Sequence, residues 1–135
     1  QLCALLMRIR IIHARQEARG AARSRASHRF REFELLVESH FTAWHQAARY
    51  AEHMGCSEKS LARATMDSAG VNPKAFLSAR VALEAKRLLA HTDLSVSDIA
   101  ESGGFTDLAN FVKFFKREAK CTPMAFRRQH LPRRS

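Results

Sequence analysis

The sequence predicts an all-α protein in which two helix-turn-helix subdomains are joined by a long central helix, with an amphipathic helix at the N-terminus. Three observations carry this prediction. A similar turn pattern occurs twice, forty-nine positions apart, around Gly55 and Gly104. Apolar residues recur three or four positions apart, the period of a helix with one buried face. Capping residues, glycines and prolines mark where the helices begin and end.

Charge and composition restrict the class of protein. The 135 residues include 23 Lys and Arg against 13 Asp and Glu, a net charge of +10. Such a surface attracts phosphate, because neutralising a phosphate releases its counterions. A solvated surface without a polyanionic partner is the alternative. The three cysteines are odd in number and far apart, which indicates reduced thiols in a cytoplasmic protein and no disulfide framework.

The first nineteen residues predict the amphipathic helix. Its apolar positions have heptad-like spacing and are interrupted by arginines, which excludes a membrane span and a cleavable signal peptide. The apolar stripe could form a coiled-coil seam between two copies or pack against the body of the protein. Two heptads are too few to decide between these two interpretations. The apolar positions are Leu2, Leu5, Leu6, Ile9 and Ile12, and the interruptions are Arg8, Arg10 and Arg15.

Residues 18–28 predict a basic linker, because they are mostly Ala, Arg, Gly and Ser with no acid and little periodicity. The chain therefore divides into residues 1–29, an amphipathic helix and linker, and residues 30–135, the double helix-turn-helix domain. One interpretation of the first part is the end of a sensor domain whose remainder is missing.

The first subdomain is built around Gly55. Apolar stripes over residues 30–41 and 47–54 predict two helices, and the glycine supplies the left-handed backbone that a short turn needs. The Ser57 hydroxyl can cap the next helix, which ends before Gly70.

Asn72-Pro73 begins the central helix, whose nineteen or so residues make a rod of roughly 28 Å. Ser95 opens the fifth helix, the sixth begins near Asp107, and Thr122-Pro123 starts a short last helix. The sixth helix directs Phe111, Phe114 and Phe115 inward and Lys113, Lys116 and Arg117 outward.

The second half of the chain contains an ordered set of residues: Asp98, Ile99, Ala100, Gly104, Phe105, Asp107, Phe111, Lys113, Phe115, Lys116, Thr122, Pro123, Phe126 and Arg127. Their combination resembles the C-terminal signature of AraC/XylS-type transcription regulators. The resemblance covers roughly Phe33 to Arg128, and Arg80, Ala85, Leu88 and Leu89 are similar to the family's linking helix.

The resemblance implies sequence-specific binding of double-stranded promoter DNA and regulation of bacterial transcription, with two recognition helices in successive major-groove segments. The domain would act in the cytoplasm and contact RNA polymerase, as an activator or a repressor according to where its site lies. We expect no cofactor, no metal and no membrane partner. A homodimer would form through residues 1–19 or through a missing N-terminal domain.

The same resemblance implies the DNA contacts. Arginine can bind guanine through two hydrogen bonds, whereas Leu108 and Val112 reach only apolar groups such as a thymine methyl, so we expect the first motif to discriminate more strongly. For the residues expected to contact phosphate, the alternative is that they are solvated charges on an ordinary exposed face. The base-facing residues are Lys59, Ser60, Ala62 and Arg63, then Leu108, Ala109, Asn110, Val112 and Lys113; the phosphate-contacting residues are Ser57, Lys116, Arg117 and Arg127.

Some positions have a structural interpretation or depart from the family pattern. Arg80 has two interpretations, a DNA ligand or an ion-pair partner of Asp98. Gly103 should loosen the end of the fifth helix, since glycine costs about 1 kcal/mol against alanine in a helix. Lys120 stands where the family usually has glycine, so it must take a left-handed conformation or the turn must change. Thr65 replaces a frequent aromatic residue.

Other classes of protein have weaker support. No nucleophile elbow or glycine-rich phosphate loop is present, so no enzyme is predicted. His53 and Cys56 have a metal-like spacing without a second pair to complete a zinc site. A DNA-targeting domain of a DNA-repair alkyltransferase and a nonspecific basic interaction module remain alternatives. The former needs a reactive thiol, and among the cysteines only Cys121 has a neighbouring cation, Lys120.

Overall fold

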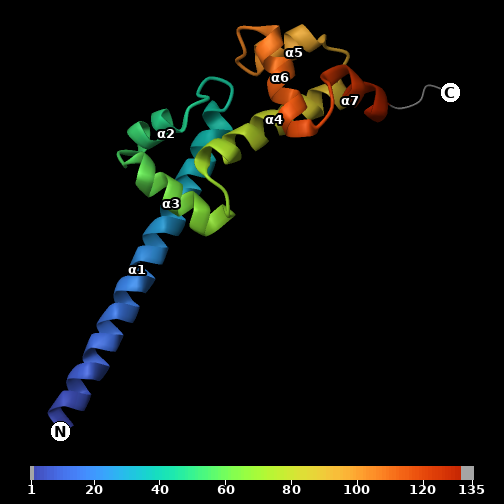
Figure 1. Ribbon diagram of the computed structural model, residues 1–135. Helices are drawn as coiled ribbons and strands as arrows, with labels where there is room; N and C mark the ends of the chain where they lie inside the picture. The colour runs from blue at the N-terminus through green and yellow to red at the C-terminus, as the bar shows by residue number, and fades with distance from the viewer. Residues whose placement is uncertain (1, 132–135) are drawn as a thin grey trace.

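The computed structural model describes residues 2–131, with side chains from Met7 onward, and this part of the chain is all α-helical apart from its turns. Figure 1 shows two long rods, α1 and α4, with α2 and α3 beside the first and α5 to α7 around the far end of the second. The predicted fold class is confirmed. The helices are α1 (Leu2–His40), α2 (Ala47–Met54), α3 (Glu58–Ala69), α4 (Pro73–His91), α5 (Val96–Ser102), α6 (Leu108–Ala119) and α7 (Pro123–His130).

Helix α1 is a single helix of 39 residues, and it runs through the segment that the sequence predicts as a linker. The expectation of irregular backbone at residues 18–28 was wrong. Alanine and arginine are among the best helix formers, and the segment contains a single glycine, Gly20. Periodicity was lacking because most of this stretch has no buried face. The division into domains at residue 29 remains a prediction.

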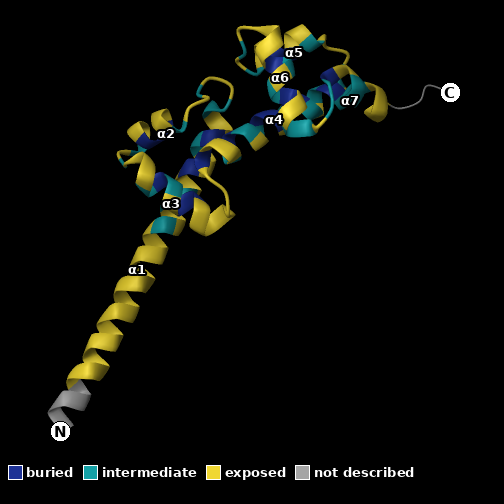
Figure 2. Cartoon of the chain, viewed as in Figure 1, coloured by how far each residue is buried: buried dark blue, intermediate teal, exposed yellow. Residues whose placement is uncertain are grey.

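The N-terminal half of α1 projects from the rest of the molecule (Figure 2), and residues 7–25 are all exposed. Ile9 is 45% exposed and Ile12 53%, so this stripe does not pack against the body of the protein. The side chains of Leu2, Cys3, Leu5 and Leu6 lie outside the described residues. Within residues 2–131 no helix is long and apolar enough to cross a membrane.

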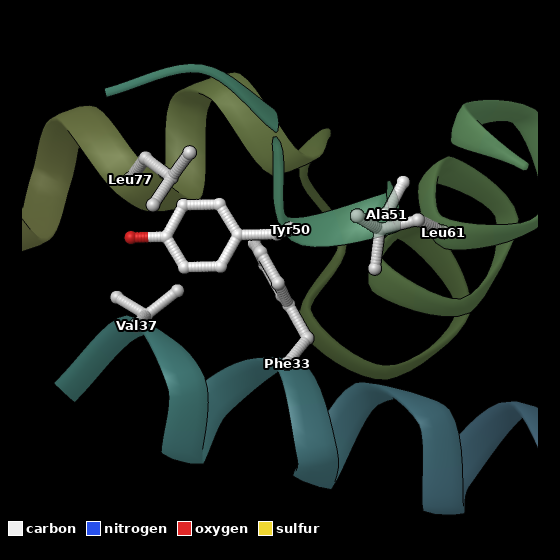
Figure 3. Packing of buried hydrophobic residues seen from close by; sticks show 6 residues of the cluster. All are labelled: Phe33, Val37, Tyr50, Ala51, Leu61 and Leu77. Atoms are coloured by element: carbon white, nitrogen blue, oxygen red, sulfur yellow. The ribbon is translucent and has the colours of Figure 1, made fainter. Parts of the chain in front are cut away.

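The first subdomain has its own core, built by α1, α2, α3 and the start of α4. Tyr50 reaches from α2 between Val37 of α1 and Leu77 of α4, and Phe33 lies beside its ring (Figure 3). The rings of Phe33 and Tyr50 meet edge to face at 5.4 Å. Each fully buried side chain of this size contributes about 1.5–3 kcal/mol, so this cluster fixes α1 to the subdomain.

The second subdomain encloses a separate core around α6. Phe111 and Phe115 are almost fully buried there, as predicted, and they pack with Ile99 of α5 and Leu89 of α4. Since α4 contributes Leu77 to the first core and Leu89 to the second, one continuous helix belongs to both subdomains. Its rigidity holds the two at a fixed separation.

Local signals explain the helix ends. Gly55 and Gly70 both have left-handed backbone, with φ of 69° and 72°. Lys120 follows α6 with φ 63°, so the predicted left-handed lysine is what the structure contains. Gly103 ends α5 with right-handed backbone, and its amide closes the helix onto the carbonyl of Ile99 at 3.0 Å.

Candidate nucleic-acid interface

The first reading helix, α3, is positioned by the turn that the sequence predicts. The Cys56 amide bonds to the Ala51 carbonyl at 3.0 Å, which closes the end of α2 around the left-handed Gly55. The Ser57 hydroxyl then accepts a hydrogen bond from the Ser60 amide at 3.0 Å and caps α3. This use of Ser57 is compatible with a phosphate contact, because the side chain remains exposed.

The two faces of α3 differ sharply. Leu61, Ala64 and Thr65 are buried, and the Thr65 hydroxyl donates to the Leu61 carbonyl at 2.8 Å. A small hydrogen-bonded side chain thus occupies the site where an aromatic is frequent. Lys59 and Arg63 lie one turn apart on the opposite, exposed face, with Ser60 and Ala62 partly exposed.

Met66 was missed by the sequence interpretation of α3. It is 52% exposed and follows Arg63 by three residues, so it continues the face of Lys59 and Arg63 by one turn. Its spacing of three residues from Arg63 could have placed it on this face from the sequence alone. An apolar side chain on this face can contact the methyl group of thymine.

The second reading helix, α6, is capped by Asp107, whose carboxylate accepts a hydrogen bond from the Ala109 amide at 2.9 Å. Burial of Phe111 and Phe115 directs the opposite side of α6 to solvent. Four of the five predicted base-facing residues are exposed, and Val112 is partly buried. The exposed four are Leu108, Ala109, Asn110 and Lys113.

The predicted phosphate ligands of the second subdomain differ in their surroundings. Lys116 and Arg117 are exposed at the end of α6, and Arg117 also lies over the Phe114 ring at 5.6 Å. Arg127 has another role, because its guanidinium donates to the carbonyl of Leu89 in α4 and to those of Thr92 and Leu94 just after it. These hydrogen bonds attach α7 to the end of α4 and the segment after it, so Arg127 is a structural residue and we do not propose it as a phosphate ligand.

Arg80 pairs with a different acid from the one that the sequence offered. Its guanidinium holds Glu38 of α1, with 2.6 Å between Nε and Oε1, and it lies 4.2 Å over the Phe41 ring. Asp98 instead belongs to the first turn of α5, where its amide is capped by Ser95. The hydrogen bonds from Arg80 hold the pKa of Glu38 below its ordinary value. Arg80 is therefore a structural residue that ties α4 to α1.

The two subdomains also touch away from α4. The loop after α1 approaches the turn between α5 and α6, and His45 Nε2 lies 2.8 Å from the Gly103 carbonyl oxygen. The same imidazole is 5.3 Å from the Phe105 ring. This contact and α4 together orient the two reading helices.

The cysteines with described side chains are part of the packing. Cys56 lies against the first core and Cys121 against the second, and both are partly buried. Burial of this kind limits access to a sulfur. The described structure therefore gives no support to an acceptor thiol of the alkyltransferase type at either position.

Comparison with known proteins identifies the same part of the chain. A family model described as a helix-turn-helix domain matches residues 50–129. The HTH-type transcriptional activator RhaS of Escherichia coli is 33% identical over 91 residues, which are 67% of this chain and 33% of RhaS. The chain thus spans about a third of the length of this relative.

Solved structures share the fold. The C-terminal domain of the response regulator yesN from Fusobacterium nucleatum is 26% identical, with a TM-score of 0.65 over 70% of this chain and 93% of that domain. The DNA-binding domain of AdpA, a global transcriptional factor solved in complex with a target DNA, is 24% identical, with a TM-score of 0.66 over 73% of this chain and 88% of that one. The chain belongs to the AraC/XylS-type helix-turn-helix family.

Proposed function

We propose that this chain binds double-stranded promoter DNA sequence-specifically and regulates bacterial transcription. The observation that carries the proposal is the pair of exposed faces on α3 and α6, held in one orientation by α4 and by the contact between His45 and Gly103. Relatives named as transcriptional regulators and a DNA complex of the same fold support it. The two reading helices would enter major-groove segments about 34 Å apart, one helical turn of DNA.

The proposed contacts divide between bases and phosphates. In the first motif, the Arg63 guanidinium would read guanine and Met66 would lie against a thymine methyl, with Lys59, Ser60 and Ala62 beside them. In the second, Asn110 would pair with adenine, and the remaining base-facing positions would be Leu108, Ala109, Val112 and Lys113. Ser57, Lys116 and Arg117 would contact phosphates, which position the protein without reading sequence.

Regulation would be positional. The bound domain would present a surface to RNA polymerase beside the promoter, in the manner of an activator, and it would act in the cytoplasm. Ile9 and Ile12 are exposed on the projecting half of α1, so this stripe is available for the seam of a homodimer. Neither an enzymatic step nor a cofactor is part of the proposal.

The test is selection of tight binders by the full chain from a pool of random duplexes, at several salt concentrations. A two-part motif with its parts about ten base pairs apart is expected. Arg63→Ala should relax one part and cost about 1–3 kcal/mol of discrimination there. Arg31→Ala, which removes an exposed arginine from α1, is the matched control.

Binding with a steep salt dependence and no enriched motif would make the chain a nonspecific basic module, and the proposed base contacts would be rejected. Replacing thymine by deoxyuridine, which lacks the methyl group, tests Met66 separately. The wild type should lose affinity at one position of the first half-site, and Met66→Ala should be insensitive to the replacement.

A further inference from the structure

Much of the positive charge of the chain lies on the first part of α1. Residues 1–31 contain eight arginines and one glutamate, which account for +7 of the net +10. Most of these arginines stand on the projecting half of the helix, where residues 7–25 are exposed. The arginines are Arg8, Arg10, Arg15, Arg19, Arg23, Arg25, Arg29 and Arg31.

Helical register places three of these arginines on one side. Eighteen residues make five turns of an α-helix, so residues eighteen apart point in the same direction. Arg15 precedes the buried Phe33 by this interval, and Arg19 precedes the buried Val37. Arg8 likewise precedes Ala26, which lies with Arg23 beside Asp67 and Ser68 at the end of α3. Arg8, Arg15 and Arg19 therefore form a stripe, on the face that α1 turns toward the first subdomain.

This face is also the side on which DNA would lie. The buried side of α3 packs on α1, whereas Lys59 and Arg63 face away from it. Packed helix axes are about 8–10 Å apart, and a helix seated in the major groove has phosphates on both walls beside it. In Figure 1 the second subdomain lies on one side of the first, and the free half of α1 extends from the other side. A duplex that runs past both subdomains would therefore continue alongside α1.

We propose that the arginine stripe, Arg8, Arg15 and Arg19, binds the phosphate backbone of the duplex that flanks the first half-site, outside the sequence read by α3 and α6. The inference rests on the proposed function. The nineteen exposed residues 7–25 span about 28 Å at 1.5 Å per residue, or roughly eight base pairs at 3.4 Å each. Phosphate is the same at every base pair, so the stripe adds salt-sensitive affinity without adding sequence preference.

The experiment measures affinity of the full chain for its selected site as a function of salt. One duplex ends at the first half-site, and another continues about ten base pairs further on that side; Arg63→Ala identifies which side it is. Arg8, Arg15 and Arg19 are changed to Ala together. Arg10, Arg25 and Arg31, which point in other directions on α1, are changed together as the matched control. Alanine keeps the helix, and circular dichroism and sedimentation verify folding and association state.

On the long duplex, the stripe variant should reduce the slope of log K against log salt by about 2–3, since each phosphate contact accounts for roughly 0.9. On the short duplex it should behave as the wild type does, and the control should change the slope by less than about one on either. A slope that falls equally on both duplexes, or equally in both variants, overturns the inference while leaving specific binding intact. If the wild type selects no motif, the proposed function itself fails and the stripe has no half-site to flank.

Discussion

His45 and Gly103, which are 58 residues apart in sequence, share a hydrogen bond of 2.8 Å between the imidazole Nε2 and the carbonyl oxygen. A carbonyl can only accept, so Nε2 carries the proton in this contact. The bond joins the loop after α1 to the turn before α6. Relative motion of the two reading helices thus requires both a bend in α4 and the loss of this contact.

Gly104→Ala should separate the two subdomains. A Cβ at this position would lie 2.0 Å from the Thr42 carbonyl oxygen, and the backbone there has φ of +86°. Gly55→Ala is the matched control, because its φ is +69° with nothing within 4 Å of the added carbon. Left-handed strain costs about 1–2 kcal/mol in both variants. Urea denaturation should show a larger decrease in the free energy of unfolding for Gly104→Ala than for Gly55→Ala. Equal decreases would mean that the contact between the two subdomains adds nothing to stability.

Arg127→Ala should destabilise the attachment of α7. The guanidinium donates to three carbonyls in and just after α4, and hydrogen bonds from a charged donor contribute roughly 1.5–3 kcal/mol each when buried. Since this side chain is only partly buried, we expect a loss of about 2 kcal/mol in denaturant unfolding. Arg128→Ala, at an exposed neighbour, should change stability by less than about 0.5 kcal/mol. A change in DNA salt dependence with unchanged stability would return Arg127 to the phosphate ligands.

Local chemistry explains why much of the fold was predictable. A capping side chain acts on amides two or three residues away, and a left-handed glycine ends the helix that it follows. The caps at Ser57 and Asp107 and the turn at Gly55 are all of this kind. Arg63 lies two positions from the buried Leu61 and Thr65, and Lys113 lies two positions from the buried Phe111 and Phe115. Residues two apart on a helix point to nearly opposite sides, so the reading faces were also predictable from the periodicity.

Contacts between distant segments were not predictable in this way. Arg80 pairs with Glu38, 42 residues earlier. Arg127 donates to carbonyls in α4 and in the segment that follows it, 33 to 38 residues earlier. Neither partner is marked by spacing, because the meeting depends on how the subdomains pack. Helix α1 was missed over residues 18–28 for a different reason. Their composition favours a helix, but they have no buried apolar stripe, so periodicity did not indicate one.

The ion pair of Glu38 with Arg80 should make stability fall in acid. The hydrogen bonds from Arg80 lower the pKa of Glu38 from 4.5 in the folded state, so the contribution of the pair is present above that pH and is lost as the pH falls through the lowered pKa. The Glu38 side chain is 56% exposed, which limits the contribution to within about 1 kcal/mol. Urea unfolding should show that Glu38→Gln is less stable than the wild type at neutral pH. The difference in the free energy of unfolding should become smaller as the pH falls. Glu34→Gln, an exposed position one turn earlier, is the control, and a loss independent of pH would contradict the assignment.

Tyr50 should titrate well above an ordinary tyrosine. Burial raises its pKa to about 12 from 10.0, and its hydroxyl donates to the Trp44 carbonyl at 3.0 Å. Because the chain has a single tyrosine, tyrosinate absorbance reports this residue alone. We expect titration near pH 12 in the native protein and near 10 in denaturant.

The raised pKa also sets the alkaline limit of the first core. The protonated phenol is favoured in the folded state, so its contribution is complete below pH 10 and is lost as the pH rises toward 12. Tyr50→Phe should cost about 0.5–1.5 kcal/mol at neutral pH through the lost hydrogen bond. The variant should lose less stability than the wild type in alkali, since phenylalanine has no proton to release. Native titration near pH 10 would show instead that solvent reaches the phenol between Val37 and Leu77, which is incompatible with the packing of this core.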